Sequence, residues 1–228
     1  MDLHEQYFLR PAAAFIRGKL TSAPPNDPLF HKPLVDLTEE EQAALFERGR
    51  AAGLKLHKFK RTMGLPRVRK VLGMLRGLHP ADLLDVGTGR GVFLWPLLDA
   101  FPTLPITTLD VLEHRVADLQ ATALGGLAHL HAHNADIRET PFPDDAFDGV
   151  TLLETLEHIP EPPRVLAEVH RLARRFVILS VPSKPDDNPE HIHLFTRARL
   201  QALLESAGFR KLHFDAVLNH LIVIAFVR

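Results

Sequence analysis

Three ionisable side chains fall within five positions of the stretch ETLEHIPEPP, residues 154–163. Glu154, Glu157 and His158 follow the apolar run FDGVTLL and precede a double proline. Two carboxylates and an imidazole can ligate a divalent cation or exchange protons with a substrate. In the structural alternative, Glu154 lines a cofactor pocket, the other two hydrogen-bond around a turn, and the prolines begin a helix.

Two more histidines follow the apolar run RFVILSVP, in the loop SKPDDNPEHIHLFT. If FDGVTLL and RFVILSVP are neighbouring parallel strands, the loops after them lie over one pocket. His191 or His193 would then join the Glu154-x-x-Glu157-His158 group. Such a set suits Mg²⁺, Mn²⁺ or Zn²⁺, and the metal would lower the pKa of an acceptor hydroxyl and fix its orientation.

A glycine-rich turn follows the run LLDV. Asp85 is followed by Gly87, Gly89 and Gly91 at alternate positions. Glycines at a strand-to-helix turn let a ligand approach the backbone closely. A dinucleotide fingerprint would need glycine at position 92, which is Val92, and a carboxylate beside the turn disfavours a pyrophosphate. The turn therefore favours a cationic ligand.

Two more acids end the next two predicted strands. Asp110 ends the run ITTLD and is placed to accept both hydroxyls of a ribose. Asp136, in NADI, could accept an adenine amino proton while Ile137 packs on the ring. Acids at three consecutive strand ends favour a nucleoside-bearing ligand.

Short apolar runs alternate with helical patterns from Asp82 onward, which is typical of a parallel sheet wrapped by helices. The preceding residues form a helical extension. They contain a helix interrupted at Pro11, a proline-rich loop, and a helix from a capping box at Thr38 to about Lys60. The helical spacing of LPRVRKVLGMLRGL predicts one more helix.

The composition sets outer limits. A chain of 228 residues with 46% hydrophobic content can bury one good core with an appendage. The longest apolar stretch, LIVIAFV, is far shorter than the roughly 20 residues that a membrane helix needs. We expect a cytoplasmic protein with no leading signal segment. Because there is no cysteine, any metal must be bound by His, Asp or Glu.

Charge is distributed unevenly. Residues 48–81 contain ten Lys or Arg, of which Arg48 is the first and Arg76 the last, and no Asp or Glu. This basic segment, Arg48 to Arg76, could bind RNA or another polyanion through phosphate neutralisation. Alternatively, it docks on the acidic remainder of its own chain.

The motifs LLDVGTGRG and NADIRETPFPDDAFDGV, with Asp110 between them, resemble the class I S-adenosylmethionine-dependent methyltransferases. The resemblance covers residues 80–228, because LQALLESAGF and RKLHFDAVLNHLIVIAFVR look like the family's last helix and closing hairpin. It implies a Rossmann-like α/β fold: a doubly wound, seven-stranded, mostly parallel sheet with an antiparallel last strand. Residues 1–79 would be the basic helical extension, forming part of a lid over the acceptor site.

The same resemblance assigns the cofactor residues. Asp85 and the Gly87/Gly89 turn would border the methionine part of S-adenosylmethionine, Asp110 would hold the ribose, and Asp136 with Ile137 would hold the adenine. Glu154 would lie where the methyl group emerges. Glu154, Glu157 and His158 are therefore the candidate catalytic residues.

The element Glu154-x-x-Glu157-His158 is also similar to metal-dependent ribose 2′-O-methyltransferases of small-RNA 3′ ends. In that comparison His191, rather than His193, is the fourth ligand, and the metal is Mg²⁺ or Mn²⁺. The pattern also resembles ubiquinone-biosynthesis O-methyltransferases. The acceptor could therefore be a hydroxyl on RNA or a small phenolic or carboxylated metabolite, and a non-catalytic S-adenosylmethionine-binding module is the alternative from another class.

Other residues that suggest a site are interpreted as structural. His129, His131 and His133 alternate along a predicted edge strand, and we interpret them as partly exposed residues without a metal. Trp95 and its apolar neighbours are expected in the core.

Overall fold

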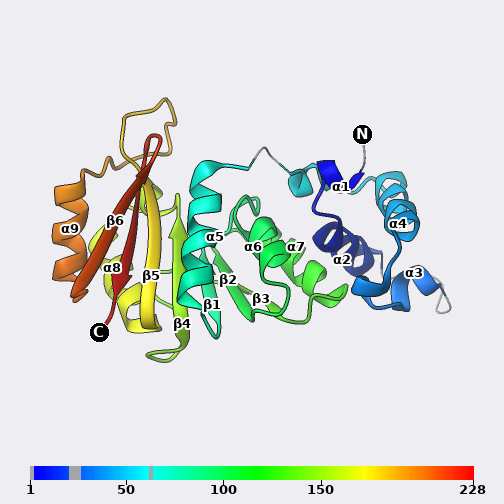
Figure 1. The fold of residues 1–228 in the computed structure, drawn as a ribbon, viewed down its shortest axis with the longest axis horizontal. Coiled ribbons are helices and arrows are strands. Elements are labelled where there is room, and N and C mark those ends of the chain that lie inside the picture. Colours follow the sequence, from blue (N-terminus) through cyan, green and yellow to red (C-terminus); the bar gives the residue numbers. More distant parts are fainter. Residues whose placement is uncertain (1–2, 21–26, 62–63) are drawn as a thin grey trace.

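A computed structural model of the protein describes residues 3–20, 27–61 and 64–228. Its centre is a seven-stranded sheet in the order β3-β2-β1-β4-β5-β7-β6 (Figure 1). Strands β1 to β5 pair in parallel, and β7 lies antiparallel between β5 and β6. The strands are β1 Leu83–Val86, β2 Ile106–Asp110, β3 Leu130–Asn134, β4 Phe147–Leu153, β5 Ala173–Pro182, β6 Lys211–Val217 and β7 His220–Phe226. The predicted α/β fold with its closing antiparallel hairpin is confirmed.

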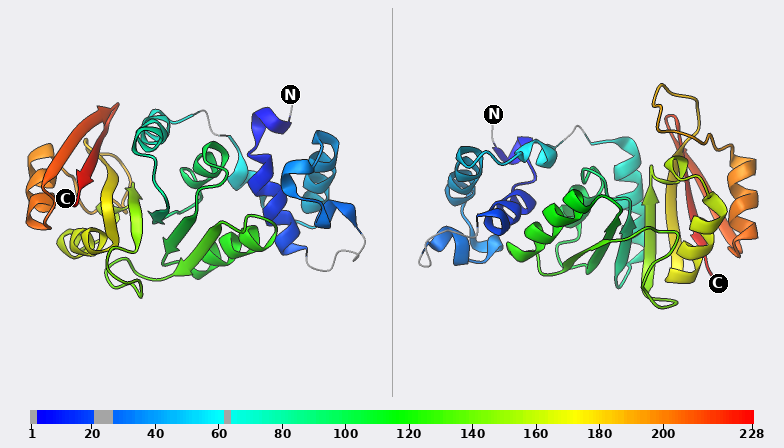
Figure 2. Two further views of the ribbon diagram at one scale, coloured as in Figure 1. Left: turned by 60° about the horizontal axis from the view of Figure 1, so that its bottom comes forward. Right: turned by 180° about the vertical axis from the view of Figure 1, so that it is seen from behind.

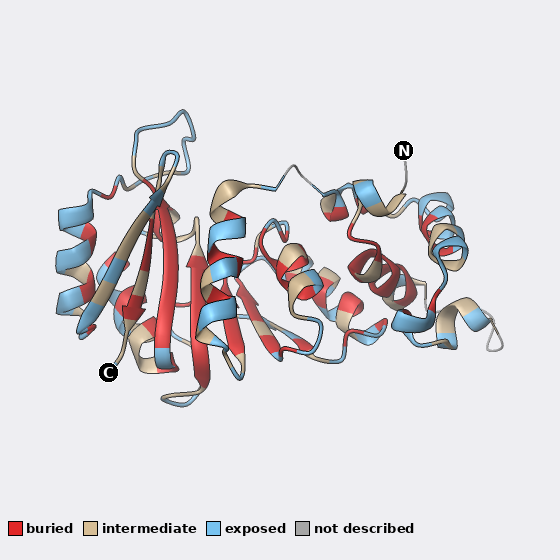
Figure 3. Cartoon of the chain, viewed as in Figure 1, coloured by how far each residue is buried: buried red, intermediate tan, exposed pale blue. Residues whose placement is uncertain are grey.

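Helices cover both faces of this sheet. They are α5 Pro66–Leu78, α6 Leu94–Ala100, α7 Glu113–Leu124, α8 Pro162–Leu172 and α9 Arg197–Ser206. Successive residues of β5 enter opposite cores, because side chains alternate along a strand: Ile178 joins the α5–α7 side, whereas Val177 joins the α8–α9 side. The central strands are accordingly buried, while the outer faces of α5 and α9 are exposed (Figure 3).

The N-terminal helices lie at the end of the molecule opposite the β6–β7 hairpin (Figures 1 and 2). They are α1 Leu3–Gln6, α2 Leu9–Lys19, α3 Pro28–His31, η1 Leu34–Asp36, α4 Glu39–Ala51 and η2 Leu56–Phe59. Helix α2 packs on α7, and α4, η1 and η2 pack on α2. Helix α2 meets α7 backbone to backbone. A Cβ added to Gly18 would lie 1.8 Å from the Ala121 carbonyl oxygen, and one added to Gly125 would lie 1.7 Å from that of Ala14.

The extension differs locally from the sequence-based expectations. The helical stretch is interrupted between Gln6 and Leu9 rather than at Pro11, which lies in the first turn of α2, where N–H groups are not needed for intrahelical bonds. The Thr38 capping box is confirmed, but α4 ends at Ala51 rather than near Lys60. Gly53 follows with a φ of +74°, a conformation that a helix cannot continue through.

Part of the predicted proline-rich loop, residues 21–26, lies outside the described residues. Its second half forms the short helix α3, whose first turn is capped by the Asp27 side chain accepting from the Leu29 amide. Among the described helices none has the length and apolar character required to cross a membrane.

Candidate cofactor and acceptor site

A cavity of about 740 Å³ opens at the carboxyl ends of β1, β2 and β4. It is lined by six of the seven predicted cofactor residues: Gly87, Gly89, Asp110, Asp136, Ile137 and Glu154. The strand order reverses between β1 and β4, and open α/β sheets bind ligands in the crevice that such a reversal leaves at the carboxyl ends of the strands. The structure therefore brings these side chains together as the sequence predicts.

The glycine turn has no room for a side chain at Gly87 or at Gly91. Gly87 has a φ of +70°, and a Cβ there would lie 2.5 Å from Thr155 Oγ1. A Cβ on Gly91 would lie 2.2 Å from the Trp95 ring. Trp95 is buried beneath the turn and its indole N–H donates to the Arg90 carbonyl oxygen, as expected for a core residue.

Asp85 is the predicted cofactor residue that does not line the cavity. Its carboxylate is buried and accepts from the hydroxyls of Thr88, at 3.0 Å, and Thr151, at 2.8 Å. Burial raises the pKa of Asp85 to about 6, and the two hydroxyl bonds offset only part of that effect. Asp85 thus supports the glycine turn from below, which differs from the expected charge facing the ligand directly.

Asp110 is held by backbone amides. Its two carboxylate oxygens accept from the amides of Gly89, at 3.0 Å, and Leu112, at 2.9 Å. Arg115 Nη1 lies 3.6 Å from Asp110 Oδ2. Each carboxylate oxygen keeps a lone pair for a further donor, so the site fits the two hydroxyls of a ribose.

Asp136 has a partner that the sequence analysis missed. The Arg138 guanidinium donates to both of its oxygens, and this hydrogen bonding is the main cause of its lowered pKa. Asp136 therefore has less capacity for an adenine amino group than predicted. Ile137 is buried beside it and contributes an apolar wall to the cavity.

Glu154 follows β4 in a left-handed conformation, with a φ of +53°. Its carboxylate accepts from Ser180 Oγ at 2.6 Å and lies 2.9 Å from His220 Nε2. Arg67 Nε lies 4.0 Å away. Strain of this kind in a non-glycine residue is typical of functional sites. It directs Glu154 toward β5 and β7.

Glu157, His158 and His191 form a separate cluster. Their ligand atoms all lie within 4.8 Å of one another, and within the described part of the chain this is the one group of acids and histidines arranged to hold a metal ion. Glu157 is completely buried, and neither carboxylate oxygen has a hydrogen-bond partner among the described residues. Burial raises the pKa of Glu157 to about 8. Glu154 lies outside the cluster, so three of the four predicted ligands converge.

The comparisons with known proteins agree with this geometry. The model of the methyltransferase domain family matches residues 56–213, more than half of the chain. The chain belongs to the class I S-adenosylmethionine-dependent methyltransferases.

Two curated relatives are themselves methyltransferases. The malonyl-[acyl-carrier protein] O-methyltransferase of Geobacter sulfurreducens is 29% identical over 188 residues, covering 71% of this chain and 69% of that one. The ubiquinone/menaquinone biosynthesis C-methyltransferase of Paracoccus denitrificans is 30% identical over 130 residues, covering 54% and 52%. Among solved structures, magnesium protoporphyrin IX methyltransferase from Synechocystis with bound SAH shares the fold, with a TM-score of 0.57 at 21% identity, over 70% of this chain and 81% of that one.

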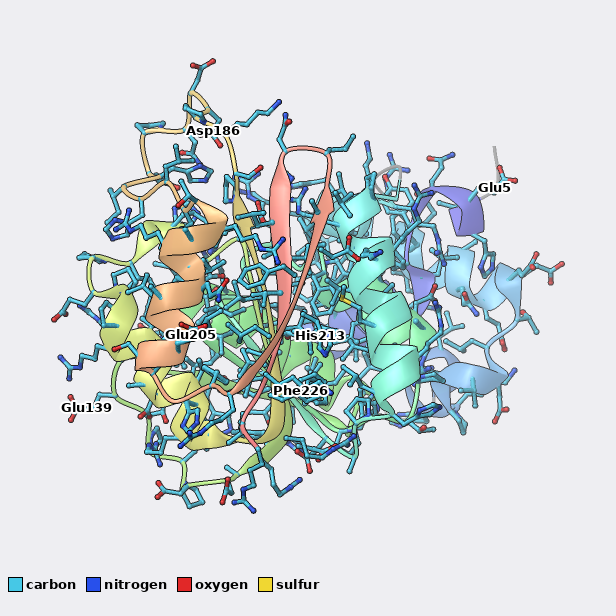
Figure 4. All side chains as sticks on the ribbon, turned by 60° about the vertical axis from the view of Figure 1, so that its left-hand side comes forward. Glu5, Glu139, Asp186, Glu205, His213 and Phe226 are labelled. Carbon is cyan, nitrogen blue, oxygen red and sulfur yellow. The ribbon has the colours of Figure 1, made fainter. Side chains whose placement is uncertain are left out.

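The loop after β5, which carries His191, packs against the turn that carries Glu157 and His158. The amides of Ile192 and His193 both donate to the backbone carbonyl oxygen of Glu157, and His193 Nε2 lies 3.1 Å from the carbonyl oxygen of Ile159. His193 is thereby bound to the backbone, which leaves His191 facing Glu157. Asp186, in the same loop, projects at this end of the sheet (Figure 4).

The histidines of the edge strand stay apart from the site. β3 is the outermost strand, His131 and His133 are exposed, and His129 is half-buried just before it. They belong to no cluster of potential ligands in the part of the chain that the structure describes.

The basic segment meets the methyltransferase's own acids at several points. Ion pairs join Arg48 to Asp27, Arg50 to Glu47, Lys58 to Asp118, Arg61 to Asp99, Arg67 to Glu154 and Lys70 to Asp215. Helix α5 is the part of the extension that reaches the Glu154 end of the site, whereas α2 packs on α7. The lid role stays a prediction, and it applies to α5.

Sequence reasoning missed three residues of the acceptor end: Arg67, Ser180 and His220. Each lies on a different element from Glu154, and His220 is 66 positions further along the chain. The sequence did predict the closing hairpin. Placing its second strand beside β5 brings His220, the first residue of β7, next to Pro182 at the end of β5.

Proposed function

We propose that the enzyme methylates an oxygen atom of a small-molecule acceptor, aided by a divalent cation that Glu157, His158 and His191 hold beside the cofactor cavity. The observation that carries this proposal is the Glu157 carboxylate. A completely buried carboxylate without a hydrogen-bond partner is costly, and buried charges in proteins are usually paired or bound to metal.

The two imidazoles are oriented as metal ligands. His191 Nδ1 lies 2.8 Å from Asp186 Oδ2, and His158 Nδ1 lies 3.0 Å from the Glu190 carbonyl oxygen. Because these acceptors fix the proton on Nδ1, each Nε2 keeps its lone pair for a ligand. Two imidazoles with one carboxylate favour a transition-metal ion such as Zn²⁺ or Mn²⁺ over Mg²⁺, which prefers oxygen ligands, and Mn²⁺ serves as the probe below.

When bound, the cation would lower the pKa of an acceptor hydroxyl and orient it. The chain supplies the remaining requirements of an in-line displacement at the sulfonium methyl group. Gly87 and Thr155 pack tightly against each other and shape the cavity wall, and Ser180 and His220 fix the Glu154 carboxylate at the cavity rim. Alignment and exclusion of water are the main contributions that such a reaction needs.

A binding measurement tests the metal part without an acceptor. We expect Mn²⁺ to bind the metal-free enzyme in isothermal titration calorimetry, and Glu157→Gln and His191→Ala to reduce the affinity at least about tenfold. His193→Ala is the matched control from the same loop and should bind like the wild type. Unchanged Mn²⁺ binding in Glu157→Gln would refute the site.

The acceptor part is tested with radiolabelled S-adenosylmethionine and matched pairs of small acceptors that differ only in a free or a blocked hydroxyl. Transfer to the free hydroxyl that falls on chelation and returns with Mn²⁺ is expected. Transfer that is indifferent to chelator would separate the methyltransferase from the metal proposal.

RNA is the second candidate acceptor, and exposed cations of the basic segment favour it. Lys55, Lys60, Arg69 and Arg76 are exposed on η2 and α5 or next to them. Replacing Lys60, Arg69 and Arg76 by Ala should abolish salt-dependent RNA retention if RNA is the acceptor. Absence of retention by the wild type at low salt would exclude it. Lys58 and Arg61 are poor test positions, because both form ion pairs within the fold.

A further inference from the structure

A second cavity, of about 400 Å³, adjoins the cofactor cavity and shares Gly89 and Arg115 with it. Four segments build it: the chain around η2, the glycine turn, the start of α6 with Trp95, and the first turns of α7. Its polar side chains are Lys55, His57, Lys58, Arg90, His114, Arg115 and Asp118. Neither the cofactor proposal nor the metal proposal uses this cavity.

Positive charge dominates its wall. Four Lys or Arg side chains and two imidazoles face one carboxylate, Asp118. That carboxylate is already neutralised twice, because both Lys58 and Lys19 form ion pairs with it. The charge on the other cations is therefore not balanced by an acid of the cavity.

Two of these cations are available for a ligand. Lys55 and Arg90 are exposed, and neither side chain makes a hydrogen bond or ion pair with any residue that the structure describes. Both line the same hollow, so an anion bound there could contact both of them. Arg90 also carries a planar fork of N–H donors, which matches phosphate oxygens.

Helix α7 adds to the same potential. It is 12 residues long, begins at Glu113 and has no side-chain cap at its N-terminus. His114 and Arg115, in its first turn, line the cavity, whereas the exposed Glu113 does not. The first amides of a helix favour an anion; that of Leu112, just before α7, already donates to Asp110.

We infer that this cavity binds the phosphate group of a small metabolite, as a second ligand next to the cofactor. It lies on the Asp110 side of the glycine turn, and Glu154 is not among its lining residues, so its ligand is not the methyl acceptor. A hollow of about 400 Å³ is of a size for a compact phosphate ester. The ion pairs of Arg48, Lys58, Arg61 and Lys70 also interrupt any continuous basic track.

The shared residue Arg115 couples the two ligands. Its guanidinium lies 3.6 Å from the Asp110 carboxylate on one side and lines the phosphate cavity on the other. A phosphate that attracts Arg115 changes the electrostatic environment of the carboxylate proposed to hold the ribose. Linkage then requires that phosphate and S-adenosylhomocysteine change each other's affinity by the same factor.

The chain provides its own reporter for the test. Trp95 is the single tryptophan of the sequence, and it lines this cavity. We expect titration with inorganic phosphate, at constant ionic strength set with chloride, to give a saturable change in tryptophan fluorescence and a matching heat in calorimetry. The double variant K55A/R90A should bind phosphate about tenfold more weakly or worse, because two charge-assisted contacts are lost. Arg76→Ala, which removes an exposed cation outside the cavity, should bind like the wild type.

Three outcomes would overturn the inference. One is the absence of a saturable signal in both measurements, and another is equal affinity in K55A/R90A and the wild type. The third is displacement of phosphate by single-stranded RNA with a steep salt dependence, which would assign the cavity to a polynucleotide. An unchanged phosphate affinity in saturating S-adenosylhomocysteine would overturn the coupling through Arg115. Because no metal or acceptor enters these measurements, they succeed or fail independently of the proposed function.

Discussion

The two ends of the main cavity handle buried carboxylates in opposite ways. At the cofactor end, Asp110 accepts from two backbone amides and Asp85 accepts from two threonine hydroxyls. At the acceptor end, Glu157 is buried as deeply and has no hydrogen-bond partner within the described residues. The protein's own donors thus satisfy the carboxylates of the cofactor end, whereas the described residues supply no donor for the buried carboxylate of the acceptor end.

The largest effect is expected from replacing Asp110, at the cofactor end. Asp110→Ala should weaken S-adenosylhomocysteine binding by at least about 100-fold, roughly 3 kcal/mol, because hydrogen bonds from both ribose hydroxyls to a charged acceptor are lost. Isothermal titration calorimetry measures the loss. Asp187→Ala, an exposed acid, is the control. Retained affinity in Asp110→Ala would show that the cofactor lies elsewhere.

A pH titration sharpens the contrast within the cofactor end. The pKa of Asp85 is raised from 3.8 to about 6, so the folded protein binds more protons than the unfolded chain between these values. Asp85 therefore destabilises the fold progressively as pH rises through that window, by about 3 kcal/mol in total. Urea unfolding at pH 4, 5, 6 and 7 should show this slope in the wild type and its loss in Asp85→Asn. Equal slopes in both proteins would contradict the assignment.

At the acceptor end, removing the carboxylate should stabilise the protein. Glu157→Met should raise the metal-free enzyme's free energy of unfolding by about 1–3 kcal/mol, because it replaces a buried unsatisfied group with an apolar one. It should also abolish Mn²⁺ binding. Glu190→Gln, an exposed acid in the next loop, should change neither property. A destabilised Glu157→Met protein would mean that the carboxylate has a structural role.

The smallest effect concerns how Glu154 is held. Ser180→Ala removes the hydroxyl that donates to Glu154 at 2.6 Å and should cost about 1.5 kcal/mol of unfolding free energy, as for hydrogen bonds to charged groups. Chemical denaturation measures this cost, with Ser183→Ala as the comparison. If the two variants are equally stable, His220 alone suffices to hold Glu154.

The same contrast explains what the sequence could predict. The cofactor end depends on local rules, because strand ends, a glycine turn and acids at those ends are readable in short segments. Asp110, Gly87 and Gly89 accordingly line one cavity, as these local rules lead one to expect, and their binding of the cofactor stays a prediction. Even there, the sequence analysis did not predict that Arg138 would donate to the Asp136 carboxylate, which was expected to bind adenine.

The acceptor end depends on contacts between distant segments. Glu154 was predicted as a metal ligand, but its left-handed backbone conformation turns it toward Ser180 and His220. No spacing in the motif reports that conformation. His191 could be placed beside Glu157 because the order of parallel strands fixes which loops meet, although the Asp186 contact that orients its ring could not. In the extension, Gly53 and Pro11 act through local backbone preferences that the helical pattern alone does not weigh.

Because α2 and α7 touch backbone to backbone, we do not expect the predicted boundary at residue 79 to separate two units that unfold independently. Gly18 in α2 and Gly125 at the end of α7 leave no room for a side chain where the two backbones touch. The extension therefore packs tightly against α7. We expect a single calorimetric unfolding transition for the whole chain, and limited proteolysis near the boundary should leave two fragments that stay associated. The helical extension would then be part of the same cooperative unit as α7 and the strands beneath it.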